Sequence, residues 1–150
     1  MGSRDNSTAD APRGLIEAIL SSASDAIIAT DADGRITEGP GFNVFALIDG
    51  SFVTPDRGVL EGVTRRAVLD IAVDQGIPAR LGAITIDDLR RADEAFLTST
   101  AGGVMPVVSI DGRVLGDGRP GPLTTRLRDA YWAAHDDPRW ATSIDYDAAR

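Results

Sequence analysis

The stretch EGPGFNVFALIDGSFVTPDRGVLEGVTRRAVLDIA, residues 38–72, holds the patterns that decide the fold. Residues 42–48 are almost entirely apolar and predict a buried strand. Asp49-Gly50 then gives a strong hairpin signal, and a second strand follows it. The apolar residues of 63–75 share one face at helical spacing, which predicts a helix. Strand, turn, strand and helix in this order, without repeated parallel units, favour an α+β fold.

The flanking sequence extends this pattern in both directions. Residues 1–12 are rich in Ser, Asp, Ala and Pro and predict a flexible leader ahead of a domain at 13–150. The further predicted elements are a helix at 13–22, a buried strand at 26–29, a turn at 31–34, a strand at 80–84, a short helix at 86–91, strands at 95–98 and 104–110, an Asp-Gly turn at 111–112 and a helix at 121–135. The sequence contains no internal repeat, so we expect one α+β domain.

Composition and charge argue against several classes of function. The 150 residues carry a formal net charge of −8 and no cysteine, which disfavours nucleic-acid binding, disulfides and cysteine metal sites. His135 is the single histidine, and one histidine without cysteine offers no metal-ligand spacing. No apolar run approaches the roughly 20 residues of a membrane helix, and the polar N-terminus lacks a signal-peptide pattern. We therefore expect a cytoplasmic protein with no nucleic-acid or membrane partner.

The chain contains no lysine. Lysine and arginine together number 15, and the sequence contains 15 arginines. Arginine stays protonated in proteins and cannot replace a lysine amine as a nucleophile towards a carbonyl group. Any chemistry that needs a lysine amine is therefore outside the reach of these residues.

Three short segments could bind a ligand. Residues 37–43 place Glu38 beside a Gly-Pro-Gly turn that could direct its carboxylate into a pocket, although it could also be an exposed glutamate before a surface turn. Residues 62–65 begin the predicted helix, where free amides and Thr64 could hold an anion, the alternative being an ordinary helix start. Residues 98–103 join hydroxyls to small residues, which predicts either an anion-binding nest or a bulged strand.

In their order and spacing these segments are far more specific than any one alone. EGPGFNVF, GVLEGVTRRAVLDIA, and FLTSTAGGVMPV with GDGRPGP resemble the large domain of class IV (fold type IV) pyridoxal-phosphate aminotransferases. TPDRGVLEGVTR, TAGGVMP and DAYWAAHDDPRW make the chain most similar to the (R)-selective amine and branched-chain aminotransferase branch. The resemblance implies a D-amino-acid aminotransferase-like α+β fold and an ancestral transfer of an amino group to a keto acid.

The resemblance also implies roles for individual residues. Glu38 matches the glutamate that pairs with the protonated pyridine nitrogen of pyridoxal 5'-phosphate, and Leu60 matches the leucine on the face of the ring. Val63 and Thr64 match the pair that holds the cofactor phosphate.

The last segment carries four more positions of the family pattern. Ser99 and Thr100 match cofactor-binding positions, while Ala101 and Gly102 lie where the family shapes its substrate pocket. The resemblance further implies a homodimer that binds a phosphorylated small molecule.

Two departures from the family pattern bear on activity. The family's Schiff-base lysine would fall at about residues 3–7, where Arg4 is nearest, and the small domain that precedes the large one in the family is missing from the sequence. We therefore expect a truncated large domain without independent transaminase activity, with pyridoxal phosphate bound non-covalently at most and no catalytic residue assigned. The alternatives are a non-covalent binding module for a phosphorylated ligand and an interaction or oligomerisation domain with a function independent of the cofactor.

Overall fold

A computed structural model describes residues 26–145 of the chain. The predicted leader at 1–12, the predicted helix at 13–22 and Arg4 lie outside the described residues. No helix within 26–145 is long and apolar enough to cross a membrane.

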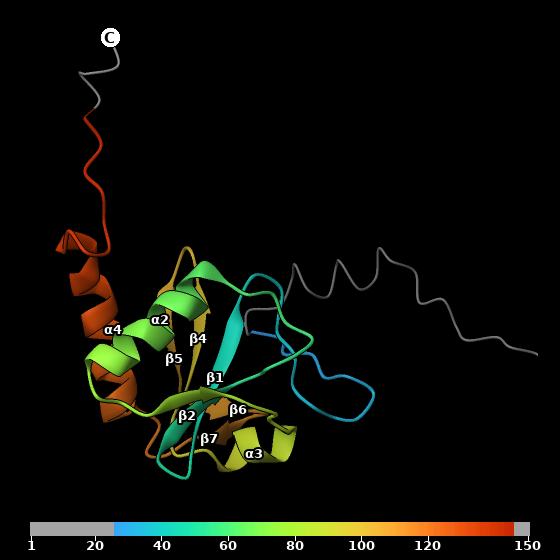
Figure 1. Cartoon of the computed structure of the whole chain (residues 1–150). Helices are drawn as coiled ribbons and strands as arrows, with labels where there is room; N and C mark the ends of the chain where they lie inside the picture. Colours follow the sequence, from blue (N-terminus) through green and yellow to red (C-terminus); the bar gives the residue numbers. More distant parts are fainter. Residues whose placement is uncertain (1–25, 146–150) are drawn as a thin grey trace, which may run out of the picture.

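A five-stranded sheet in the order β3-β2-β1-β4-β5 forms the centre of the fold (Figure 1). The strands are β1 (Asn43–Ile48), β2 (Ser51–Thr54), β3 (Ala79–Leu81), β4 (Ala95–Ser99) and β5 (Gly103–Val107). All neighbours are antiparallel except β2 and β3, which run parallel. The predicted hairpin is confirmed, because Asp49 and Gly50 take φ angles of 49° and 75° between β1 and β2. Positive φ at both turn positions is what a tight hairpin turn requires.

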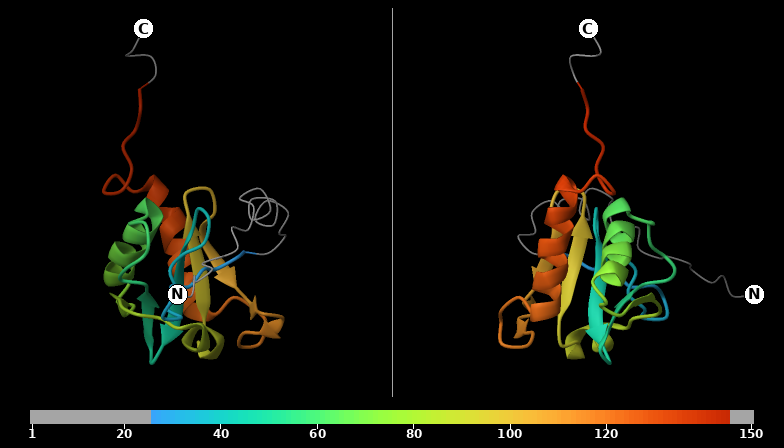
Figure 2. Two further views of the ribbon diagram at one scale, coloured as in Figure 1. Left: turned by 90° about the vertical axis from the view of Figure 1, so that its right-hand side faces the viewer. Right: turned by 60° about the vertical axis from the view of Figure 1, so that its left-hand side comes forward.

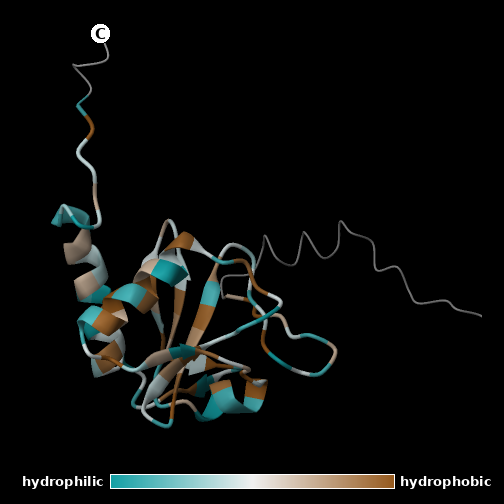
Figure 3. Cartoon of the chain, in the orientation of Figure 1, coloured by the Kyte–Doolittle hydropathy of each residue, from teal (hydrophilic) through white to brown (hydrophobic). Residues whose placement is uncertain are grey.

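Two helices cover one face of this sheet. Helix α2 (Val63–Asp74) and helix α4 (Pro122–Ala133) pack against each other and against the same side of the strands, and Figure 2 shows them from two further directions. Figure 3 shows apolar and polar residues interspersed along α2, and Val68, Ile71 and Ala72 are the apolar residues that it buries in the core. The predicted helices at 63–75 and 121–135 are therefore confirmed.

The core beneath these helices is aromatic. Phe96 on β4 is fully buried and stacks on Phe45 of β1, with ring centroids 4.6 Å apart. Phe52 of β2 meets the same ring edge-on at 5.0 Å. The opposite face of the sheet packs against helix α3 (Ile86–Arg91), whose Leu89 is buried. The α+β architecture expected from the sequence is confirmed.

Three predicted strands differ from the structure. Residues 26–29 do not form a buried strand, because only Ala29 makes backbone hydrogen bonds to the chain at 37–38 and Ile27 is 36% exposed. The strand predicted at 80–84 is the shorter β3. The strand predicted at 104–110 divides into β5 and β6 (Ser109–Ile110), and β6 pairs with β7 (Arg113–Val114). Because β4 begins opposite Val107, the chain beyond Val107 has no partner in the main sheet.

Candidate functional site

A cavity of about 490 Å³ lies where α2 begins. Its lining comes from three segments that are distant in sequence, namely the turn at 38–43, the loop and helix start at 60–64, and the end of β4 at 98–100. These are the three segments that the sequence singled out. The pairing of β1 with β4 brings the first and third together, since Asn43 lies opposite Thr98.

The carboxylate of Glu38 is held in one orientation. Its Oε2 atom accepts hydrogen bonds from the backbone amide of Leu60 at 2.8 Å and from Nδ2 of Asn43 at 2.9 Å. Its Oε1 atom accepts no hydrogen bond from any residue within 26–145. Glu38 therefore presents one fixed, unshared carboxylate oxygen at the cavity, as a site for a hydrogen-bond donor requires.

The turn after Glu38 depends on glycine. A Cβ atom on Gly39 would lie 1.9 Å from the ring of Phe42, and Gly41 has a φ of 79°, which side chains rarely tolerate. Gly39 and Phe42 exchange backbone hydrogen bonds of 3.3 Å across the turn. The close approach predicted from the Gly-Pro-Gly sequence is present, and it sets where the Glu38 side chain leaves the backbone.

The N-terminus of α2 is open at the cavity. Gly62 is the N-cap, no side chain caps the helix, and its first turn contains no acidic residue. The backbone amides of Val63 and Thr64 donate no hydrogen bond within residues 26–145. Unpaired amides and the positive end of the helix dipole make such a terminus an anion site.

Helix α4 begins in a similar way, but a carboxylate of the protein itself binds the amides at its N-terminus. It also begins after a glycine N-cap, Gly121, that provides no side-chain cap. There, however, the buried carboxylate of Glu94 accepts hydrogen bonds from the amides of Leu123 at 3.1 Å and Thr124 at 2.7 Å. Both helices have 12 residues and a glycine N-cap, and they differ in the first residue, which is proline in α4, and in the anion. At α4 the protein supplies it, while at α2 the amides remain available to a ligand.

The third segment brings hydroxyl groups to the cavity. Ser99 and Thr100 line it, whereas Ala101 and Gly102 continue the turn and are not part of its lining. The Ser99 hydroxyl accepts a hydrogen bond of 2.9 Å from the Gly102 amide, which closes the turn. A Cβ atom on Gly102 would lie 2.3 Å from Sδ of Met105, so a larger residue here would require the Met105 side chain to move.

The structure brings together around one cavity the six residues that the resemblance assigned to cofactor binding, and it adds Asn43 and Thr98; the six are Glu38, Leu60, Val63, Thr64, Ser99 and Thr100. Asn43 is 5% exposed and also donates to the Leu60 carbonyl oxygen at 3.0 Å. The buried hydroxyl of Thr98 has no hydrogen-bond partner in the described part of the chain. A polar residue at each of these positions in otherwise apolar strands was a signal that could have identified both.

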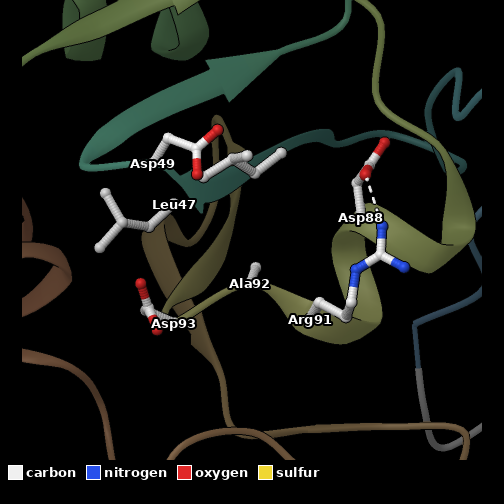
Figure 4. A pocket seen from close by; sticks show the side chains of 7 residues that line it. Leu47, Asp49, Asp88, Arg91, Ala92 and Asp93 are labelled. Carbon is white, nitrogen blue, oxygen red and sulfur yellow. Dashed lines mark hydrogen bonds and ion pairs between the residues drawn. The ribbon is translucent and has the colours of Figure 1, made fainter.

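A second cavity, of about 250 Å³, is poorly suited to bind an anion (Figure 4). It lies between the β1–β2 turn and α3, and Asp49, Asp88 and Asp93 line it. Its one cationic lining residue, Arg91, already pairs with Asp88 at 3.1 Å. The helix start beside this cavity, that of α3, is already capped by the side chains of Thr85 and Asp88, so unlike α2 it offers no uncapped helix N-terminus to an anion. Within residues 26–145 no cluster of His, Asp or Glu side chains is arranged to hold a metal ion.

Comparison with known proteins gives the family context of this geometry. Residues 13–110 match the model of the family described as amino-transferase class IV. The branched-chain-amino-acid aminotransferase of Pseudomonas aeruginosa is 41% identical over 119 residues, which are 79% of this chain and 38% of that protein. The Escherichia coli enzyme of the same name is 40% identical over 107 residues, 70% of this chain and 35% of that protein.

Solved structures show the same likeness. The structure of the T.th. branched-chain amino acid aminotransferase with pyridoxamine 5'-phosphate superposes with a TM-score of 0.78 at 38% identity, covering 87% of this chain and 45% of that one. The Escherichia coli branched-chain amino acid aminotransferase gives 0.75 at 35% identity, covering 80% and 42%. The chain thus spans less than half of the length of these relatives. The matched family model, the shared fold and these identities together show that the chain belongs to the class IV aminotransferase family.

Proposed function

We propose that this chain is the cofactor-binding large domain of a class IV aminotransferase-like protein and binds pyridoxal or pyridoxamine 5'-phosphate non-covalently. The family reaction would be the transfer of an amino group to a keto acid. One observation carries the proposal. The unshared oxygen of Glu38 and the uncapped N-terminus of α2 belong to one cavity, so an acceptor and an anion site are offered to the same ligand.

The donors and acceptors present suit a phosphorylated pyridine. The amides of Val63 and Thr64 and the hydroxyl of Thr100 would bind the phosphate, because the first two are unpaired and all three residues line the cavity. Oε1 of Glu38 would accept a hydrogen bond from the protonated ring nitrogen. Leu60, which is 71% exposed, offers an apolar side chain to a ring face.

When bound, the cofactor supplies an electron sink for reactions at an amino-group carbon. This chain's own contribution is to hold the ring nitrogen protonated. An ionised carboxylate within hydrogen-bond distance favours the protonated form of its partner. Asn43 and the Leu60 amide keep that carboxylate in place by occupying its other oxygen.

The absence of lysine decides the mode of binding. All 15 basic residues are arginines, so the 150 residues contain no amine side chain that could bond the cofactor aldehyde. We therefore propose binding through hydrogen bonds and charge alone, with no transaminase activity from these residues by themselves. The (R)-selective amine aminotransferase likeness, the homodimer and the cytoplasmic location stay predictions from the sequence. Light scattering of the purified chain, with and without cofactor, tests the homodimer.

A titration tests the proposed function. Purified protein would be mixed with pyridoxamine phosphate and, separately, with pyridoxal phosphate, while thermal midpoint and visible absorbance are followed. We expect saturable stabilisation by both ligands and no borohydride-trapped adduct of the second. Glu38→Gln should weaken both, whereas Asp70→Asn, which removes the same charge from an exposed position of α2, should not. Absence of stabilisation, or a covalent adduct at this site, would contradict the proposal.

A further inference from the structure

A buried arginine lies in the first turn of α2, next to the proposed phosphate site. Arg65 is only 6% exposed. Its Nε atom donates to the Thr54 hydroxyl at 3.1 Å, and its Nη2 atom donates to the carbonyl oxygen of Pro55. Both acceptors are uncharged. Within residues 26–145 Arg65 forms no ion pair, so its charge is not neutralised by direct contact.

A buried charge without a paired counter-charge is unusual in proteins, because removing it from water costs free energy that only an opposite charge recovers well. Burial accordingly lowers the pKa of Arg65, while the negative charges of Glu61 and Glu38 act at longer range in the opposite direction. Arginine nevertheless remains protonated at neutral pH. The first turn of α2 therefore carries a permanent positive charge in a site of reduced polarity.

The position of Arg65 links it to two of the three segments that line the cavity. Through Thr54 and Pro55 it fastens the end of β2 to α2. The loop that leaves Pro55 carries Leu60, whose backbone amide orients Glu38. Arg65 itself is engaged and does not line the cavity, so it does not touch the ligand directly. The next residue, Arg66, carries the same charge but is exposed.

We infer that Arg65 is a positioning residue for a phosphate bound at the start of α2. It supplies a positive charge, unpaired by direct contact within residues 26–145, behind the amides of Val63 and Thr64. A phosphate dianion is the counter-charge that this buried guanidinium lacks. The inference rests on the proposed function, because it requires that a phosphorylated ligand occupies the cavity.

Calorimetric titration of four proteins with two ligands tests this role. The proteins are the wild type, Arg65→Met, Arg65→Lys and, as a matched control, Arg66→Met. The ligands are pyridoxamine phosphate and pyridoxamine, which differ only in the phosphate. We expect Arg65→Met to raise the Kd for pyridoxamine phosphate about tenfold and to leave the Kd for pyridoxamine within about twofold. Arg66→Met should change neither by more than about twofold, because its charge is solvent-exposed.

Arg65→Lys should preserve the binding of pyridoxamine phosphate, and it offers a second result that could refute the inference. It keeps the charge, so the Kd for pyridoxamine phosphate should stay within about threefold of the wild type. A tenfold or larger loss in Arg65→Lys would overturn the inference even if Arg65→Met does not fold. Equal weakening of both ligands by Arg65→Met would overturn it too, since that marks a purely structural role. A wild type that binds neither ligand would instead overturn the proposed function.

Discussion

The comparison of the two helix starts can be tested at α4, where the anion is part of the protein. In Glu94→Gln one of the two oxygens that receive the amides of Leu123 and Thr124 becomes an NH₂ group. A hydrogen bond to a charged group contributes about 1.5–3 kcal/mol, and a buried donor left without an acceptor costs about 1–3 kcal/mol. Because Glu94 is only 7% exposed, water cannot readily replace the lost partner. We expect the free energy of unfolding to fall by about 2–4 kcal/mol.

Urea unfolding followed by circular dichroism would measure this loss, together with the thermal midpoint. For a domain of this size 1 kcal/mol corresponds to about 2–4 °C, so the midpoint should fall by about 4–16 °C. Asp93→Asn is the matched control, because it removes one negative charge from the adjacent, exposed residue. A loss in Glu94→Gln below about 0.5 kcal/mol, within the usual range for surface substitutions, would refute the reasoning that these amides need an anion.

Three further predictions concern the cavity, the pH dependence of stability and the core. Gly62→Ala should weaken cofactor binding and lower the free energy of unfolding by about 1–3 kcal/mol, because the Cβ atom of the new alanine would lie 2.3 Å from Oδ1 of Asn43. Melting and binding curves that match those of the wild type would contradict this prediction. Asp88 caps α3 with Thr85, whose hydroxyl, as the main cause, lowers the pKa of Asp88. The ionised Asp88 carboxylate therefore contributes to the free energy of unfolding above the ordinary aspartate pKa of about 4, and this contribution is lost as the pH falls further. Asp88→Asn should cost about 1 kcal/mol at pH 7 in urea unfolding, and the difference from wild type should shrink at lower pH. Phe96→Ala should cost about 3–5 kcal/mol by the same assay, since the ring is fully buried, and a loss below about 1 kcal/mol would show that the core relaxes around it.

Sequence patterns predicted the elements whose signals are local. The Asp-Gly pair at 49–50 marks its hairpin because few residues accept positive φ at both turn positions. The helix at 63–75 followed from apolar spacing within a single segment. Short apolar runs without a known partner were less informative. Residues 26–29 resemble a buried strand, but only Ala29 makes backbone hydrogen bonds, to residues 37–38, and none of the four joins the main sheet.

The contacts that organise the cavity and the start of α4 could not be read from the sequence, because they join distant residues. Asn43 reaches the Leu60 carbonyl across 17 positions, and Glu94 reaches the start of α4 across about 30. Neither pairing has a local pattern. Arg65 appeared in the sequence as one of two adjacent arginines, and only the packing shows that it is buried while its neighbour is exposed.

The most direct test of the central claim is a nitrogen–proton NMR titration with pyridoxamine phosphate. The account predicts that the amide signals of Val63, Thr64 and Thr100 move saturably, because these groups surround the proposed phosphate site. The signals of Asp49 and Asp93 at the acidic cavity should stay in place. Movement that is absent from the start of α2, or that gathers at the acidic cavity, would contradict the claim that this chain holds a phosphorylated cofactor at the N-terminus of α2.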